Sequence, residues 1–230
     1  MANLGTEARD EYLQIELARA AHVLVTQVRP VGAGQQVLIS ADTGSDARVV
    51  HATAGAVYAA GATPVIVSYP MLPEPMLEPP APVARAALGA DVWIDFTVAY
   101  QLYSPAYRAA IENGCIYVCL TGMDADMMVR TIGRGNHGPM EEMATLLYGM
   151  SQAAETVRVT SPAGTDAVMR GNKAGDPFWE PMPAEGGFPQ MLGGQSGYVF
   201  HRESFEGVLV FDGCLWPPAE LGLLRTPVRL

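Results

Sequence analysis

The residues best placed for chemistry lie just after a strand-like run at residues 157–160. In that run valines alternate with arginine and threonine, which is the period of two expected of a half-buried strand. Pro162 cannot continue a strand ladder and Gly164 frees the backbone, so the chain carries Thr165 and Asp166 round a tight polar turn. The local pattern alone also fits an ordinary β-hairpin, so both interpretations stay open.

The four histidines are far apart in sequence, and no two of them have the spacing of a metal-binding pair. His22 and His51 fall within predicted helices, where we expect packed or surface side chains. His201 ends a strand-like run beside an arginine and a glutamate and is the better candidate for chemistry. Cys115 and Cys119 share one face of a β-like run, but the sequence around them supplies no further zinc ligands, so we expect both in the core.

The sequence contains neither a dinucleotide-binding motif nor the motif of a serine nucleophile. The glycines within residues 32–34 precede the first predicted strand, whereas a dinucleotide-binding loop needs them after a strand. The segment 41–46 does follow that strand and precedes a helix, which is where open α/β sheets bind ligands, but a well-capped turn also explains it. Ser196 lies in a Gly-Gln-Ser-Gly stretch that lacks the spacing of a nucleophile elbow.

Helices and strands alternate along the first part of the chain. The strands predicted there are short and apolar, at residues 36–40, 64–69, 92–97 and 116–120. The helices predicted around them cover residues 6–28, 45–60, 83–88, 105–112 and 124–132. Apolar strands that alternate with helices indicate a parallel sheet covered on both faces, so the predicted fold class is α/β.

The pattern changes after the glycine-rich stretch 133–138, which is the best linker candidate. A helix from residue 139 to about 155 leads into turn-rich strands. These strands are predicted near residues 157–160, 167–170, 198–201, 207–212 and 226–230. We therefore expect one domain over residues 1–138, and a linker helix with the start of a β-rich (α+β) segment over residues 139–230.

Composition places the chain among folded enzyme domains. It has 230 residues, of which 49% are hydrophobic and 17% charged, and this indicates extensive burial or subunit contacts. A net charge of -10 without a basic cluster argues against nucleic acid as a partner. The apolar runs are too short to span a membrane, the N-terminus lacks a signal-peptide pattern, and the cysteines suit a reducing cytoplasm. We expect a cytoplasmic homo-oligomer with a small-molecule substrate.

Several stretches resemble one known enzyme family in their order and spacing. They are residues 91–95, 102–105, 120–124, 160–166, 196–198 and 206–213. The family contains 2,5-dihydroxypyridine 5,6-dioxygenase and the M29-type metallo-aminopeptidases. The resemblance implies a Rossmann-like parallel-sheet domain, followed by the start of a β-rich domain that carries a divalent metal.

The resemblance also implies a set of site residues. We expect Tyr103, Glu185 and His201 to act in catalysis as proton donors or acceptors. The residues expected to bind the substrate are Ser104, Thr165, Asp166, Ser196 and Tyr198. Thr165 and Asp166 should face the same side as Tyr103, because parallel sheets bind ligands at the carboxyl ends of their strands.

Two of these positions depart from the family pattern. Tyr103 stands where the dioxygenases have a histidine near the substrate, and Tyr198 stands where the aminopeptidases have a metal-binding glutamate. The metal ligands of the dioxygenases lie in a C-terminal segment that has no counterpart in this chain. We therefore expect the ligands to come from polypeptide beyond Leu230 or from a second chain, and residues 1–230 alone to bind no catalytic metal with a complete ligand set.

The leading hypothesis is a non-haem Fe(II) dioxygenase that cleaves a small dihydroxylated N-heterocycle or a related aromatic ring. One alternative is a metal-dependent aminopeptidase or amide hydrolase, in which zinc or manganese activates water and Glu185 is the base. Another is a non-catalytic subunit or a small-molecule-binding homologue. The metal content of the native assembly distinguishes these hypotheses. Iron indicates the dioxygenase, zinc or manganese indicates the hydrolase, and the absence of metal indicates the non-catalytic protein.

Overall fold

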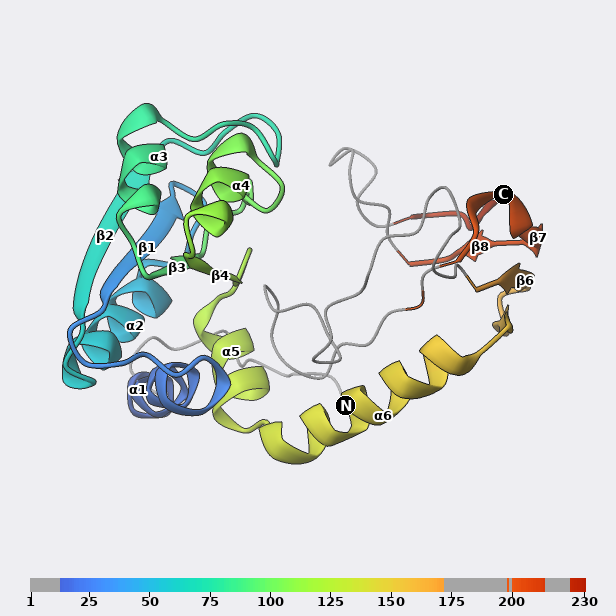
Figure 1. Cartoon of the computed structure of the whole chain (residues 1–230), viewed down its shortest axis with the longest axis horizontal. Helices are drawn as coiled ribbons and strands as arrows, with labels where there is room; N and C mark the ends of the chain where they lie inside the picture. Colours follow the sequence, from blue (N-terminus) through green and yellow to red (C-terminus); the bar gives the residue numbers. More distant parts are fainter. Residues whose placement is uncertain (1–12, 172–197, 199, 214–223) are drawn as a thin grey trace. The chain divides into compact units, whose positions relative to one another are not determined.

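The computed structural model describes residues 13–171, 198, 200–213 and 224–230 (Figure 1). These residues form two compact units, the first ending at Glu142 and the second beginning at Met143. The domain boundary that the sequence predicts, between residues 138 and 139, stays a prediction.

The first unit is built on a four-stranded parallel sheet. Its strands are β1 (Gln36–Asp42), β2 (Thr63–Tyr69), β3 (Val92–Asp95) and β4 (Ile116–Cys119). Their order across the sheet is β2-β1-β3-β4, and each neighbouring pair is parallel. The parallel α/β sheet expected from the sequence is therefore confirmed.

Helices cover both faces of this sheet (Figure 1). They are α1 (Gln14–Val23), α2 (Ala47–Ala59), α3 (Ala81–Leu88), α4 (Pro105–Glu112) and α5 (Ala125–Met128). Val37 and Ile39 of β1 pack with α1, α2 and α5 in one hydrophobic cluster, whereas Leu38 between them packs with α3 and α4 in another. Because successive side chains of a strand point to opposite faces, a sheet covered on both sides favours strands that are apolar on both faces.

Two predicted helices differ from the regular form. The described part of the first begins as α1 at Gln14 and continues as a π-helix over Leu24–Val28. A second π-helix, Val129–Gly133, follows α5 and packs against α1. Gly133 lies at this contact, where an added β-carbon would be 3.0 Å from Cβ of Ala20. The spacing of apolar residues does not distinguish a π-helix, which has more residues per turn, from an α-helix. The sequence therefore predicts a regular α-helix in both places.

The second unit contains strands, as the sequence predicts, and their pairing is antiparallel. Strands β5 (Thr156–Thr160), β6 (Asp166–Arg170) and β7 (Glu206–Val208) form one sheet in that order, and β8 (Val210–Phe211) pairs with β9 (Val228–Arg229). Helix α6 (His137–Ala153) begins in the first unit and precedes β5. Within the residues that the structure describes, every helix is too short or too polar to cross a bilayer.

The sequence predicts a strand at residues 198–201, and this prediction is wrong for the residues of that range that the structure describes. Phe200 makes an isolated bridge to Gly171, and Arg202–Ser204 form a 3-10 turn. The backbone N–H of Ser204 donates to the carbonyl of His201 (2.9 Å). This bond turns the chain, so strand pairing does not continue past Phe200.

Asp46 joins the starts of two helices in the first unit. Its carboxylate caps α2 by accepting the N–H of Arg48 (2.9 Å), and it also accepts the N–H of Ala125 (3.1 Å), the first residue of α5. The Arg48 guanidinium lies 2.7 Å from the same carboxylate. This hydrogen bond holds the pKa of Asp46 below its ordinary value of 3.8.

We expect Asp46→Ala to lower the free energy of unfolding by about 1–2 kcal/mol, because it removes the cap of α2. Asp46→Asn keeps a capping oxygen and should lose less. Since the folded pKa of Asp46 is lowered, its ionic contribution is present above pH 3.8 and disappears as the pH falls through the folded pKa. Urea denaturation should show the difference between wild type and Asp46→Asn shrinking on acidification; a difference that grows contradicts this role.

Candidate functional site

The strand order places a topological switch point between β1 and β3. From β1 the chain moves to β2 on one side and then returns to β3 on the other. In open parallel sheets, ligands bind outside the carboxyl ends of the strands at such a point. Here these ends are Asp42 and Asp95, the last residues of β1 and β3. Both are buried, with 3% and 0% of their surface exposed.

Asp42 binds the loop that follows β3. Its Oδ2 accepts hydrogen bonds from the backbone N–H groups of Val98 (2.7 Å) and Ala99 (3.2 Å). Its Oδ1 accepts the N–H of Gly44 (2.9 Å). Val98 also packs on this turn, because a β-carbon at Gly44 would lie 3.0 Å from Cγ2 of Val98. The segment 41–46 is therefore a capped turn, and the protein's own loop occupies the switch point.

Asp95 is the centre of a buried polar network. Its Oδ1 accepts the hydroxyl of Ser40 (2.7 Å) and both the N–H (3.1 Å) and the hydroxyl (2.7 Å) of Thr97. Its Oδ2 accepts the N–H of Gln101 (3.0 Å) and the hydroxyl of Tyr117 (2.6 Å). Burial raises the pKa of Asp95, and the hydrogen bonds from Tyr117 and Ser40 offset part of this effect.

The proline-rich segment after β2 contacts the same region. The backbone N–H of Met76 donates to the carbonyl of Tyr100 (2.9 Å). The carboxylate of Glu78 accepts the N–H of Ala106 (2.9 Å), in the first turn of α4. These contacts fix the outer side of the loop, while Asp42 and the Asp95 network fix its inner side.

Two buried polar atoms beside the network have no hydrogen-bond partner in the described part of the chain. They are the hydroxyl of Tyr69 and Oε1 of Gln101. Burial, and then the charges of Asp95 and Asp42, raise the pKa of Tyr69. Thr97 and Gln101 lie near enough to oppose this rise in the pKa, although neither reaches hydrogen-bond geometry with the hydroxyl. A phenol donates and an amide oxygen accepts, so each of these atoms has an unused hydrogen-bonding capacity among the described residues.

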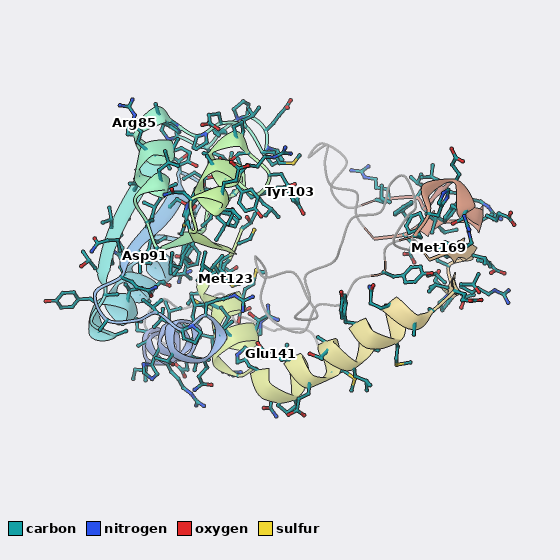
Figure 2. The ribbon with its side chains drawn as sticks, in the orientation of Figure 1. Arg85, Asp91, Tyr103, Met123, Glu141 and Met169 are labelled. Carbon is teal, nitrogen blue, oxygen red and sulfur yellow. The ribbon has the colours of Figure 1, made fainter. Side chains whose placement is uncertain are left out.

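Tyr103 follows this loop in a backbone conformation that is rare for its residue type. Its φ is 70°, in the left-handed region, and its side chain is 52% exposed. The next residue, Ser104, is buried and caps α4 by accepting the N–H of Tyr107 (3.1 Å). The Tyr103 and Tyr107 rings meet edge to face, with centroids 6.0 Å apart. Figure 2 shows Tyr103 beside α4, and the residue belongs to the segment that connects the carboxyl end of β3 to α4.

The predicted polar turn is the tip of the β5–β6 hairpin, so the hairpin interpretation is confirmed. The Thr165 hydroxyl accepts the N–H of Val210 (3.0 Å), which ties the turn to β8. The Asp166 carboxylate pairs with Arg158 at 2.8 and 2.7 Å, and this exposed ion pair lowers the pKa of Asp166. Thr165 and Asp166 therefore both have structural roles in the hairpin. Their role in substrate binding, and their position relative to Tyr103 in the other unit, stay predictions.

Tyr198 and His201 both lie against the end of β6. A β-carbon at Gly171 would be 3.0 Å from the Tyr198 hydroxyl, and the N–H of His201 donates to the carbonyl of Arg170 (2.9 Å). The Tyr198 hydroxyl and Nδ1 of His201 are buried atoms without a hydrogen-bond partner among the described residues. Burial raises the pKa of Tyr198. The structure thus brings these two predicted site residues to one end of one strand.

Comparison with known families identifies the chain. A model of the NicX family, described as 2,5-dihydroxypyridine 5,6-dioxygenase, matches residues 20–212. The chain belongs to the NicX family. The match includes the parallel sheet and most strands of the second unit, and it confirms the resemblance expected from the sequence. No curated protein matches the chain.

Solved structures share the fold of this NicX-family chain. The 2,5-dihydroxypyridine dioxygenase of Pseudomonas putida KT2440 is 17% identical, with a TM-score of 0.62 over 94% of the chain. Wild-type AmpT from Thermus thermophilus is 15% identical, with a TM-score of 0.50 over 88% of the chain. The chain spans only 65% and 66% of the lengths of these two proteins. At such identities the likeness shows the fold alone.

The metal that the family implies has no complete ligand set among the described residues. In that part of the chain, three or more His, Cys, Asp or Glu side chains nowhere come close enough to hold an ion. The described donors therefore do not fit iron(II), zinc or manganese. Two predicted site residues, Glu185 and Ser196, lie outside the described residues. The expectation that residues 1–230 lack a full ligand set stays a prediction.

Sequence reasoning missed the network around Asp95. In the sequence, Asp95 stands out only as part of a predicted strand and of a stretch that resembles the family. One signal was available, because Ser40 and Asp95 are polar residues within otherwise apolar strands. Such residues need a partner when they are buried. Finding that partner required the register in which Ser40 lies opposite Asp95.

Proposed function

We propose that this chain forms part of a metal-dependent dioxygenase that opens the ring of a small dihydroxylated N-heterocycle or a related aromatic compound. The observation that carries the proposal is the NicX-family match over residues 20–212. The proposed metal is iron(II), with zinc or manganese as the alternative, and its ligands come from outside the described residues. The proposed setting is the cytoplasm, where a homo-oligomer or a second chain completes the site.

The reaction in the family's name needs no reductant besides the substrate. The ring bond between carbons 5 and 6 breaks, and each of these carbons forms a bond to one atom of O2. The ring supplies the electrons that reduce O2. The protein must therefore bind the ring, orient it and handle the protons of its hydroxyl groups.

Tyr103 is the residue of the first unit that we assign to proton handling. Its hydroxyl is on an exposed side chain, and a phenol can donate to or accept from a ring hydroxyl. Ser104 acts beside it as the cap that fixes the start of α4. Tyr103 is thus the proposed catalytic residue, and the substrate-binding role expected of Ser104 stays a prediction beside its position as the cap of α4.

Tyr198 and His201 are the corresponding candidates of the second unit. Each has a buried polar atom without a partner among the described residues, and this supports a role for each in binding a substrate group. A neutral imidazole nitrogen accepts a proton, which suits His201 as a base toward a ring hydroxyl. We assign substrate orientation to Thr165, Asp166 and Ser196, and a further proton-transfer role to Glu185.

The test is oxygen uptake by the purified protein. The native assembly, loaded anaerobically with iron(II), is mixed with 2,5-dihydroxypyridine and O2. We expect equal amounts of oxygen and substrate to disappear, and isotopically labelled O2 to place both of its atoms in the product. The same assembly loaded with zinc should take up no oxygen.

Other outcomes decide between the remaining functions. Cleavage of an aminoacyl anilide without oxygen, dependent on zinc or manganese, would establish the hydrolase instead. A native assembly that contains no metal and turns over neither substrate would make the chain a small-molecule-binding homologue. Either outcome excludes the dioxygenase.

A further inference from the structure

The loop between β3 and α4 is held mainly through its backbone. Four of its N–H groups, those of residues 97, 98, 99 and 101, donate to the carboxylates of Asp42 and Asp95. Buried N–H groups require acceptors, and hydrogen bonds to a carboxylate are stronger than those between neutral groups. The two carboxylates therefore supply the hydrogen-bond acceptors that a neighbouring strand would supply in a sheet. In this way they define the path of the loop.

Tyr103 lies between two fixed points on this path. Upstream, Val98 and Ala99 are bound to Asp42. Downstream, the N–H of Ser104 donates to the carbonyl of Gln101 (2.9 Å), and its hydroxyl caps α4. A tyrosine in the left-handed region persists only where the surrounding structure fixes it from both sides.

The aromatic rings provide a second connection to the same loop. The Tyr103 ring packs on Tyr107, and Tyr107 packs on Tyr117 with centroids 4.9 Å apart. Tyr117 in turn donates its hydroxyl to Asp95. The ring contact between Tyr103 and Tyr107 therefore reports whether Tyr103 keeps its position.

We propose that Asp42 is a positioning residue, which holds the N–H groups of Val98 and Ala99 and thereby fixes the location of Tyr103. Its effect on catalysis rests on the function proposed above. Asp42 is suited to a test because its carboxylate reaches the loop without joining the network of Asp95, Tyr117 and Ser40. Replacing it should release one end of the loop while the core of the sheet remains.

The test compares three variants of the whole protein. Asp42→Ala removes the acceptor, and Asp42→Asn keeps one oxygen that can take the loop N–H groups. Asp46→Ala is the matched control, because Asp46 lies in the same turn but caps α2 and does not touch the loop. The measurements are the nuclear Overhauser effect between the rings of Tyr103 and Tyr107, amide hydrogen exchange at Val98 and Ala99, and kcat/KM.

We expect Asp42→Ala to lose the ring contact, to exchange both amides faster, and to lower kcat/KM by about 10- to 100-fold, mostly through kcat. Asp42→Asn should retain the contact and most of the activity. Asp46→Ala should retain both when it is compared at an equal folded fraction. If Asp42→Ala does not fold, the comparison of Asp42→Asn with the control carries the test, and any faster exchange of Val98 and Ala99 in Asp42→Asn should be accompanied by a weaker ring contact.

The proposal is overturned if Asp42→Ala keeps the ring contact, or if it loses the contact at unchanged kcat/KM. It is also overturned if the control loses contact and activity to the same extent. Where the alanine variant does not fold, an Asp42→Asn protein that loses the ring contact while Val98 and Ala99 exchange as in wild type would overturn it. A wild-type protein without dioxygenase activity would instead defeat the proposed function, while the ring contact and amide exchange would still decide whether Asp42 fixes Tyr103.

Discussion

Alanine in place of Asp95 is expected to lower the free energy of unfolding by about 3–5 kcal/mol, a large part of the stability of an ordinary domain. The substitution leaves five hydrogen-bond donors in the core without their acceptor. The hydroxyls of Ser40 and Tyr117 can turn, but the backbone N–H groups of Thr97 and Gln101 cannot. Urea denaturation followed by circular dichroism measures the loss.

The matched control for this prediction is Asp126→Ala. Asp126 is an exposed carboxylate that pairs with Arg130 at 2.7 Å on the same helical surface. Such pairs contribute about 0.2–1 kcal/mol. Equal losses in the two variants would show that the buried network adds no stability beyond an exposed ion pair.

The pH dependence of the Asp95 variants has a definite sign. Burial raises the folded pKa of Asp95 above its ordinary value of 3.8. Its contribution to stability is therefore full below pH 3.8 and is lost as the pH rises through the folded pKa. Asp95→Asn cannot ionise, so the advantage of wild type over this variant should shrink as the pH rises. An advantage that grows with pH would mean that the hydrogen bonds outweigh burial.

Tyr103→Phe is expected to lower kcat for ring cleavage by about 100-fold, because it removes a proton-transferring hydroxyl from the proposed site. The free energy of unfolding should stay within about 0.5 kcal/mol of wild type, since the substituted group is on an exposed side chain. Phenylalanine keeps the ring that packs on Tyr107. Steady-state oxygen uptake at saturating substrate measures the effect.

Tyr58→Phe is the control for this experiment. Tyr58 is 76% exposed and lies on α2, so it loses the same hydroxyl at a place without a proposed role. It should retain the wild-type kcat. A wild-type kcat in Tyr103→Phe, with the dioxygenase activity itself established, would remove Tyr103 from the chemistry and leave it a surface residue.

Hydrophobic pattern and turn residues were enough to predict the parallel sheet. The apolar run after Gln36 and the glycines at the ends of helices are local features, and Gly61 and Gly114 have the positive φ of helix C-caps. Residues 198–201 also have an apolar strand-like pattern. In the structure, however, Phe200 forms an isolated bridge with Gly171, which lies just after β6, and the chain then turns. Whether a strand forms depends on a partner strand, which the local pattern does not contain.

The site was harder to predict than the fold because its parts are distant in sequence. The bond between Asp42 and Val98 joins residues that are 56 positions apart, and Ser40 reaches Asp95 across 55. Neither carboxylate belongs to a motif of fixed spacing. Tyr103 was identified through the family-like stretch 102–105, but no local pattern predicts its left-handed backbone.

A loop held through its backbone is a favourable place for protein engineering. The path around residue 103 is defined by Asp42, Asp95 and the cap at Ser104, whereas the Tyr103 side chain is largely exposed and makes none of these bonds. Glycine, asparagine, aspartate and histidine tolerate the left-handed conformation better than other residues. A library limited to these four would change the chemical group offered at the edge of the sheet and leave its location unchanged.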